Sequence, residues 1–250
     1  MTTRGIVYIA FGTEYDRLAA NTIGLSCPFI SCPITVLTNL PPKKRSKKWS
    51  EMTGINFVYL DILTCKNREV KIQIYKYTPY DETIYLDCDS IVRRSGIEKV
   101  FDHLSGKNIV FQHHKLWETV ETKYYRLYRD TAKILGVDLP FRVCLGGFWA
   151  FRKLPETTEF FEKWRAFWIK MGSGRDMPAL AMAIKKTGID HAVVYKQQEN
   201  YFSFGIHSDA IVVHRTGKDD LADYFGVPHY RANKPFDVGR SDQWEMVKWN

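Results

Sequence analysis

Short apolar runs alternate with helix-spaced apolar positions through the first half of the chain. Four of these runs have the length and composition of buried strands: Ile6–Phe11, Ile34–Leu37, Phe57–Leu60 and Thr83–Leu86. Apolar spacing predicts one helix from Tyr15 to Leu25 and another from Val70 to Tyr77, which ends before Pro79. The resulting β-α-β-β-α-β order predicts an α/β domain with a largely parallel sheet.

The second half of the chain is patterned differently, with longer helices. Strands are predicted at Ile109–Phe111, Phe148–Phe151 and Ala210–Val213. Helices are predicted over Trp117–Thr131 and over the aromatic stretch Phe160–Trp168, whose stripes favour core packing. No repeat or linker divides the 250 residues, which are enough for one well-buried domain.

Composition and charge narrow the class of protein. Hydrophobic residues make up 45% of the chain and charged residues 26%, which excludes disordered and fibrous classes. The net charge of +8 favours anionic partners such as nucleotides, phosphates or acidic membrane surfaces. The densest basic run, from Lys43 to Lys48, is interpreted as a solvated loop. No nucleic-acid-binding motif accompanies it, so we expect no nucleic-acid partner.

The cysteines and the N-terminus bear on where the protein works. Five scattered cysteines suggest neither a disulfide framework nor a zinc site. The first residues lead directly into a strand-like run, which is not typical of a signal peptide. No run approaches the roughly 18 apolar residues that a transmembrane helix needs. We therefore expect a reduced, cytoplasmic protein without a transmembrane segment.

Two carboxylates, Asp87 and Asp89, flank Cys88 directly after the fourth predicted strand. Inside a strand, residues two apart share a face, so we expect both carboxylates to reach one ion. Ligands of such sheets collect at the carboxyl ends of the strands. Paired hard oxygens suit Mg²⁺ or Mn²⁺. Alone, the same pattern also fits a solvated acidic turn.

His214 follows the last predicted strand and precedes Gly217 and Lys218. Its imidazole could complete a mixed oxygen and nitrogen metal site, and the glycine–lysine pair could hold a diphosphate. The alternative is a half-buried histidine that bonds to the backbone.

Three further features allow both a structural and a functional interpretation. Asp176 precedes a helical run and is either its N-cap or an acidic group of the active site. Gly146 and Gly147 stand before a predicted strand, where they let a ligand lie against the backbone or make a tight strand entry. Lys71, by itself, is expected to be an exposed cation.

The segment from Lys71 to Asp89 resembles the donor-site segment of the glycogenin-like (family 8-like) nucleotide-sugar glycosyltransferases. It has their helical lysine, their Thr-x-Tyr at Thr78 to Tyr80, and their strand ending in D-x-D. Thr13-x-Tyr15 resembles the uridine-binding start of that family. Three looser matches follow in order. Leu145–Phe148 stands where the family has Asn-Ser-Gly, and Asp176–Leu180 resembles its Asp-Gln helix start. His214–Gly217 resembles the opening of its H-x-x-G-x-x-K motif, with Asp220 at the lysine position.

The resemblance implies a fold and an activity. The fold would be GT-A, a Rossmann-like α/β domain over residues 1–250 with a central, mostly parallel sheet flanked by helices. Residues up to about 110 would bind the nucleotide, and 111–250 would bind the sugar and acceptor. The activity would be a metal-dependent transfer of a hexose from a UDP-sugar, with retention of configuration. The sequence leaves open the sugar, the acceptor (a glycan, a lipid-linked molecule or a protein) and a homodimeric state.

The resemblance also implies residue roles. Asp87, Asp89 and His214 would hold Mn²⁺ or Mg²⁺, and Asp176 and Lys218 would act at the reacting centre. Donor contacts would come from Phe11, Gly12, Tyr15, Lys71, Leu86, Asp87, Cys88, Gly146, Gly147, Gly217 and Lys218.

Two other functions compete with this one. A haloacid-dehalogenase-like phosphatase also begins with D-x-D at a strand end, but on its first strand, whereas three strands precede Asp87 here. A catalytically inactive sugar-nucleotide-binding protein is suggested by the departures at Leu145, Met177 and Asp220. All three implied metal ligands are nevertheless present in the sequence.

Overall fold

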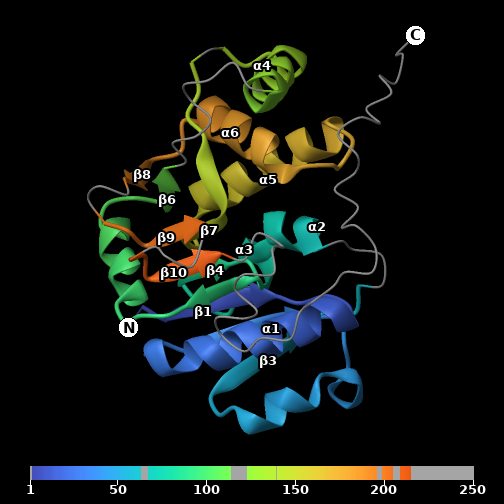
Figure 1. Ribbon diagram of the computed structural model, residues 1–250. Helices are drawn as coiled ribbons and strands as arrows, with labels where there is room; N and C mark the ends of the chain where they lie inside the picture. Colours follow the sequence, from blue (N-terminus) through green and yellow to red (C-terminus); the bar gives the residue numbers. More distant parts are fainter. Residues whose placement is uncertain are drawn as a thin grey trace.

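A seven-stranded sheet forms the centre of the molecule, with a three-stranded sheet beside it (Figure 1). The computed structural model describes residues 2–62, 67–113, 123–138, 140–195, 199–204 and 209–214. The strand order of the large sheet is β3-β2-β1-β4-β7-β6-β8. Its strands are β1 (Arg4–Ile9), β2 (Ile34–Thr38), β3 (Ile55–Tyr59), β4 (Glu82–Leu86), β6 (Ile109–His113), β7 (Cys144–Arg152) and β8 (His191–Val194).

The large sheet is mostly parallel. Among the described strands, β7 alone runs antiparallel to its neighbours, pairing with both β4 and β6. The remaining pairs are parallel. The small sheet has the order β5-β10-β9, with β5 (Ser90–Val92), β9 (Phe202–Phe204) and β10 (Val212–His214).

Helices cover both faces of the large sheet. They are α1 (Thr13–Ser26), α2 (Asn67–Ile72), α3 (Ile74–Tyr77), α4 (Lys123–Leu135), α5 (Pro155–Lys170) and α6 (Asp176–Thr187), with short 3-10 helices η1 (Cys27–Phe29), η2 (Pro42–Lys44), η3 (Lys47–Glu51) and η4 (Ile97–Leu104). None of the helices in the described ranges is long and apolar enough to cross a membrane.

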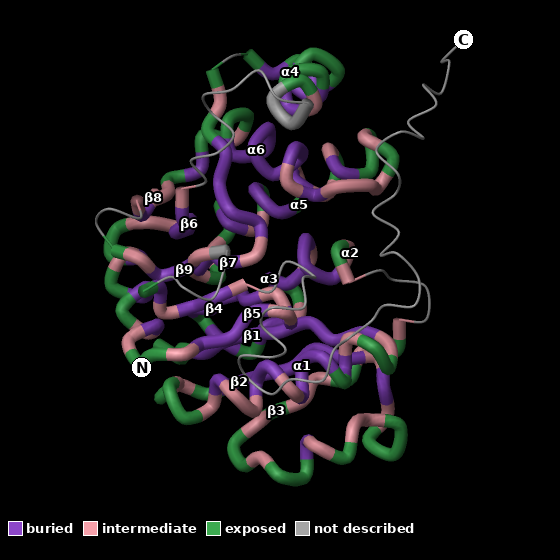
Figure 2. The backbone as a smooth tube through the Cα atoms, viewed as in Figure 1, coloured by how far each residue is buried: buried purple, intermediate pink, exposed green. Residues whose placement is uncertain are grey.

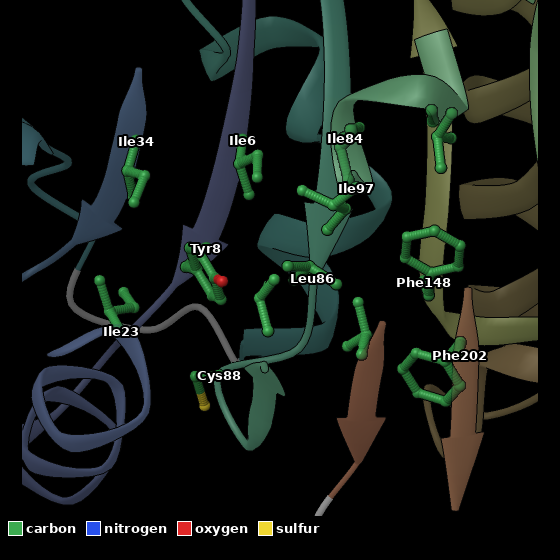
Figure 3. Close-up of a cluster of buried hydrophobic side chains, with 14 of the residues drawn as sticks. Ile6, Tyr8, Ile23, Ile34, Ile84, Leu86, Cys88, Ile97, Phe148 and Phe202 are labelled. Carbon is green, nitrogen blue, oxygen red and sulfur yellow. The ribbon is translucent and has the colours of Figure 1, made fainter. Parts of the chain in front are cut away.

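Side chains that alternate along the strands build the two large hydrophobic clusters of the core, one on each face of the large sheet. Ile6 and Tyr8 of β1 face α1 and η4, in the cluster drawn in Figure 3. Val7 and Ile9 of the same strand face α2, α5 and α6. A sheet that is covered on both faces has fully buried central strands, as the purple tube of β1 and β4 in Figure 2 shows.

Several predicted elements differ from the observed ones. The single helix predicted over Val70–Tyr77 is two short helices, because Gln73 between them leaves the helical conformation (φ −109°, ψ 13°). The short strands β5, β8 and β9 and the helix η4 were not predicted. Of the helix predicted from Trp117, the described part is α4; Trp117 itself lies outside the described residues.

Candidate metal and donor site

The two carboxylates of the D-x-D motif lie in a turn rather than inside a strand. Strand β4 ends at Leu86, and the Ser90 amide donates a hydrogen bond of 3.0 Å to the Asp87 carbonyl to close the turn. The expectation that the two carboxylates share a strand face is therefore wrong. The Asp87 amide donates to the Gly147 carbonyl at 3.0 Å, which fixes the start of this turn against β7.

Strand β10 brings His214 to this turn. It pairs antiparallel with β5, so that His214 lies opposite Ser90, one residue after the motif. The His214 Nε2 atom is 3.1 Å from Asp89 Oδ1 and 3.8 Å from Asp87 Oδ2. One ligand atom from each residue lies within 4.8 Å of the others. Two carboxylates and an imidazole form a donor set that fits Mn²⁺ or Mg²⁺.

The electrostatics of this cluster favour a positive charge at its centre. Burial alone would lower the pKa of His214, but Asp89 and Asp87 outweigh it and raise this pKa to about 10. Burial would raise the pKa of Asp87, yet Lys71 and His214 hold it well below its usual range. The Asp87 carboxylate is therefore ionised at neutral pH, and the cluster attracts a cation, either a proton on the imidazole or a divalent ion.

Lys71 is buried rather than exposed, with 6% of its surface accessible. Its Nζ atom lies 2.8 Å from Asp176 Oδ2 and 3.5 Å from Asp87 Oδ1. It also lies 5.3 Å from the ring centre of Tyr85, whose hydroxyl donates to Asp87. Burial opposes the charge of Lys71, but the two carboxylates raise its pKa above the usual value. A lysine is tolerated at such a depth because it is paired.

Asp176 is the first residue of α6, and the N-cap position belongs to Arg175. The N-cap interpretation of Asp176 is therefore wrong. Its carboxylate is buried and points to Lys71. This lysine connects the start of α6 with α2 and, through Asp87, with the candidate metal cluster.

The two glycines lie within β7, which begins at Cys144, and not before the strand as predicted. A Cβ atom on Gly147 would meet Asp87 Oδ2 at 2.7 Å, and one on Gly146 would meet Met177 Cγ at 2.8 Å. Both glycines therefore allow side chains of the site to lie directly against the strand.

These residues surround one cavity of about 250 Å³. The sequence-predicted residues that line it are Tyr15, Lys71, Asp87, Cys88, Asp89, Gly146, Gly147, Asp176 and His214. Phe11 and Leu86 belong to the core, with 5% and 0% of their surfaces exposed, and neither lines the cavity. Gly12 is the N-cap of α1, where its φ of +83° suits glycine. Gly217 and Lys218 lie outside the described residues.

Further cavity residues were not identified as site residues from the sequence: Ile9, Leu18, Asn67, Arg68, Tyr85 and Met177. Tyr85 had a signal, because it stands two positions before Asp87 at the end of an alternating strand. Arg68 had one too, because it precedes Lys71 by three positions and so shares its helix face.

Comparison with known proteins identifies the fold. No family model matches the chain, and no curated protein sequence matches it. Solved structures do match, among them a galactosyltransferase, LgtC, in complex with donor and acceptor sugar analogs (TM-score 0.61, 14% identity, 85% of this chain and 87% of that chain). An active-site mutant of LgtC matches with a TM-score of 0.58, at 14% identity over 86% of this chain and 88% of that one. The chain therefore has the predicted GT-A fold.

Proposed function

We propose that the protein is a metal-dependent glycosyltransferase that transfers a sugar, in particular a hexose, from a UDP-sugar donor. The observation that carries this proposal is the Asp87–Asp89–His214 cluster, which lies at the carboxyl end of β4 and faces the cavity of a GT-A fold. The similarity to LgtC, solved with donor and acceptor sugar analogs, supports it. That similarity does not favour the phosphatase alternative.

The chain supplies the parts that such a reaction needs. A Mn²⁺ or Mg²⁺ ion held by the cluster would supply Lewis-acid stabilisation of the departing diphosphate. Tyr15 lines the cavity from α1 and is our candidate for contact with the nucleoside. Gly146, Gly147 and Asp176 line the side of β7 and α6, where we place the sugar. Lys71 holds Asp176 and Asp87 in fixed relation to each other.

The test is hydrolysis of UDP-sugars without an acceptor, assayed with Mn²⁺, with Mg²⁺ and with excess EDTA. We expect EDTA to abolish sugar release and Asp89→Asn to reduce it by about 100-fold or more, since loss of a metal ligand removes several kcal/mol of transition-state stabilisation. Asp130→Asn, on the exposed face of α4, is the matched control and should retain activity. Full activity in EDTA, or in the Asp89 variant, would refute the proposal.

A further inference from the structure

Arg68 is a cation on the wall of the cavity to which neither the motifs nor the resemblance gives a role. It is the second residue of α2, one helical turn before Lys71. Its side chain is exposed to solvent, and its Nη1 donates a long hydrogen bond of 3.4 Å to the Gly174 carbonyl. Four of its five N–H donors are thus not used by that bond.

The charges of the cavity distinguish Arg68 from its neighbours. Lys71 is already matched by Asp176 and Asp87, and His214 lies against Asp89. Across the residues that the structure describes, no carboxylate lies within ion-pair distance of Arg68. Among the cations that the structure describes on the cavity wall, Arg68 is therefore the one whose charge no carboxylate matches. This charge can bind an anionic ligand.

Arg68 lines the same cavity as Tyr15 and the Asp87–Asp89–His214 cluster, and its charge acts on Tyr15. Burial raises the pKa of Tyr15, and the charges of Cys88 and Asp89 add to this effect. The charge of Arg68 acts in the opposite direction and lowers this pKa. Arg68 therefore lines the same cavity as Tyr15, where we place the nucleoside, and as the metal cluster. When the nucleoside lies at Tyr15 and the ion binds the diphosphate, the diphosphate has to lie between Tyr15 and the metal cluster, in the cavity that Arg68 lines.

We propose that Arg68 binds the diphosphate of the nucleotide donor, an inference that rests on the proposed function. Its planar guanidinium offers paired N–H donors that match phosphate oxygens, which an ammonium group does not. Transfer breaks the bond between the anomeric carbon and a diphosphate oxygen, which keeps the electron pair. The acceptor hydroxyl oxygen bonds to that carbon and releases its proton to water. The negative charge that grows on the diphosphate lies beside Arg68.

This role also accounts for a departure in the sequence. In the motif that begins at His214, Asp220 stands where the resembled family has lysine. Arg68 supplies positive charge from a different element, α2, far earlier in the chain. A carboxylate at position 220 is then compatible with diphosphate binding.

The experiment measures dissociation constants by titration calorimetry in Mn²⁺ for uridine, UMP, UDP and inorganic pyrophosphate. The variants are Arg68→Gln and Arg68→Lys, with Arg129→Gln on exposed α4 as the matched control. We expect Arg68→Gln to weaken UDP and pyrophosphate by about tenfold or more, Arg68→Lys to weaken them less, and uridine to be unaffected. The exposed side chain with one long hydrogen bond makes unfolding of these variants unexpected.

The outcomes separate this inference from the proposed function. If the wild type binds UDP and Arg68→Gln binds it equally well, the inference fails and the proposed function stands. Equal weakening of uridine and UDP would show a merely structural role and would also overturn it. If the wild type binds pyrophosphate but no uridine nucleotide, the proposed donor is wrong, and the effect of Arg68→Gln on pyrophosphate still decides the inference. Binding of neither ligand overturns both.

Discussion

Gly147 supports Asp87, a proposed metal ligand, in two ways. Its carbonyl accepts the Asp87 amide, and the space where a side chain would stand is filled by Asp87 Oδ2. A methyl group there would lie 2.7 Å from that oxygen, closer than real Cβ contacts allow. Because Asp87 is also held by Tyr85 and Lys71, it cannot move away without breaking one of those contacts.

Gly147→Ala should therefore weaken Mn²⁺ binding by about tenfold or more, because the carboxylate is displaced from the cluster while His214 and Asp89 stay in place. Metal affinity can be measured by titration calorimetry, and sugar release can be assayed in the same preparation. Gly24→Ala is the matched control. A Cβ there would lie 3.6 Å from the Lys48 side chain, and alanine in the last turn of α1 should add about 0.4–1 kcal/mol of stability. Unchanged metal affinity in Gly147→Ala would contradict the argument.

At this scale the sequence predicted which residues form the site better than it predicted their surroundings. Asp87, Asp89 and His214 were identified from strand ends, residue chemistry and the family resemblance together, and the structure brings them together. The burial of Lys71 could not be predicted, since a helix pattern does not reveal that the start of α6, about a hundred residues later, lies against it. Asp176 needed the same tertiary contact, and its sequence neighbours favoured a cap equally.

At the scale of elements, the small sheet determines where His214 lies. Strands β5 and β10 are three residues long, too short for a periodic pattern to appear in the sequence. Yet β5 follows the D-x-D turn directly, and its pairing with β10 brings a residue from more than a hundred positions away to the carboxylates. The sequence predicted a strand before His214 but not its partner strand.

Arg93 binds the residues that lead into β10. Its backbone amide donates to the Ile211 carbonyl at 2.9 Å and its Nε to the Ala210 carbonyl at 3.1 Å. Arg93→Met removes the hydrogen bond to the Ala210 carbonyl and keeps the apolar stem, so β10 should be held less firmly. We expect the Mn²⁺ dissociation constant to rise by about two- to tenfold, the effect of one hydrogen bond.

The matched comparison is Arg94→Met. Arg94 is exposed and donates to the Asp209 carbonyl at 3.1 Å, one residue farther from β10 along the chain. Its effect on Mn²⁺ affinity should be smaller than that of Arg93→Met. A lower melting temperature in Arg93→Met with unchanged metal affinity would show that the bond stabilises the fold without positioning His214.

At the scale of the whole molecule, the sequence predicted the α/β class and the parallel half of the sheet. Strands β1, β2 and β4 are buried on both faces and read as continuous apolar runs between clear turn signals. The insertion of β7 between β4 and β6 could not be predicted, because antiparallel pairing depends on partners distant in sequence. That strand matters to function, since it presents Gly146 and Gly147 to the cavity.

The charge of the whole cavity predicts that metal and nucleotide bind cooperatively. Its wall pairs Asp87, Asp89 and Asp176 with Lys71 and His214, so a diphosphate that enters without a divalent ion meets only the unmatched positive charge of Arg68. A divalent ion at the cluster adds positive charge there and offers open positions to phosphate oxygens. By linkage, the nucleotide must then strengthen metal binding by the same factor that the metal strengthens nucleotide binding.

This coupling can be measured as thermal stabilisation of the intact chain. UDP and Mn²⁺ together should raise the melting temperature by more than the sum of their separate effects, since each ligand that binds the folded state stabilises it by mass action. UDP-sugars and GDP-sugars tested in the same way would identify the base. Asp89→Asn should abolish the excess shift, whereas Asp130→Asn on α4 should keep it, because Asp130 is exposed and pairs with Arg129 away from the cavity. A UDP shift that is the same with and without Mn²⁺ would show that the cluster does not hold a metal against the diphosphate.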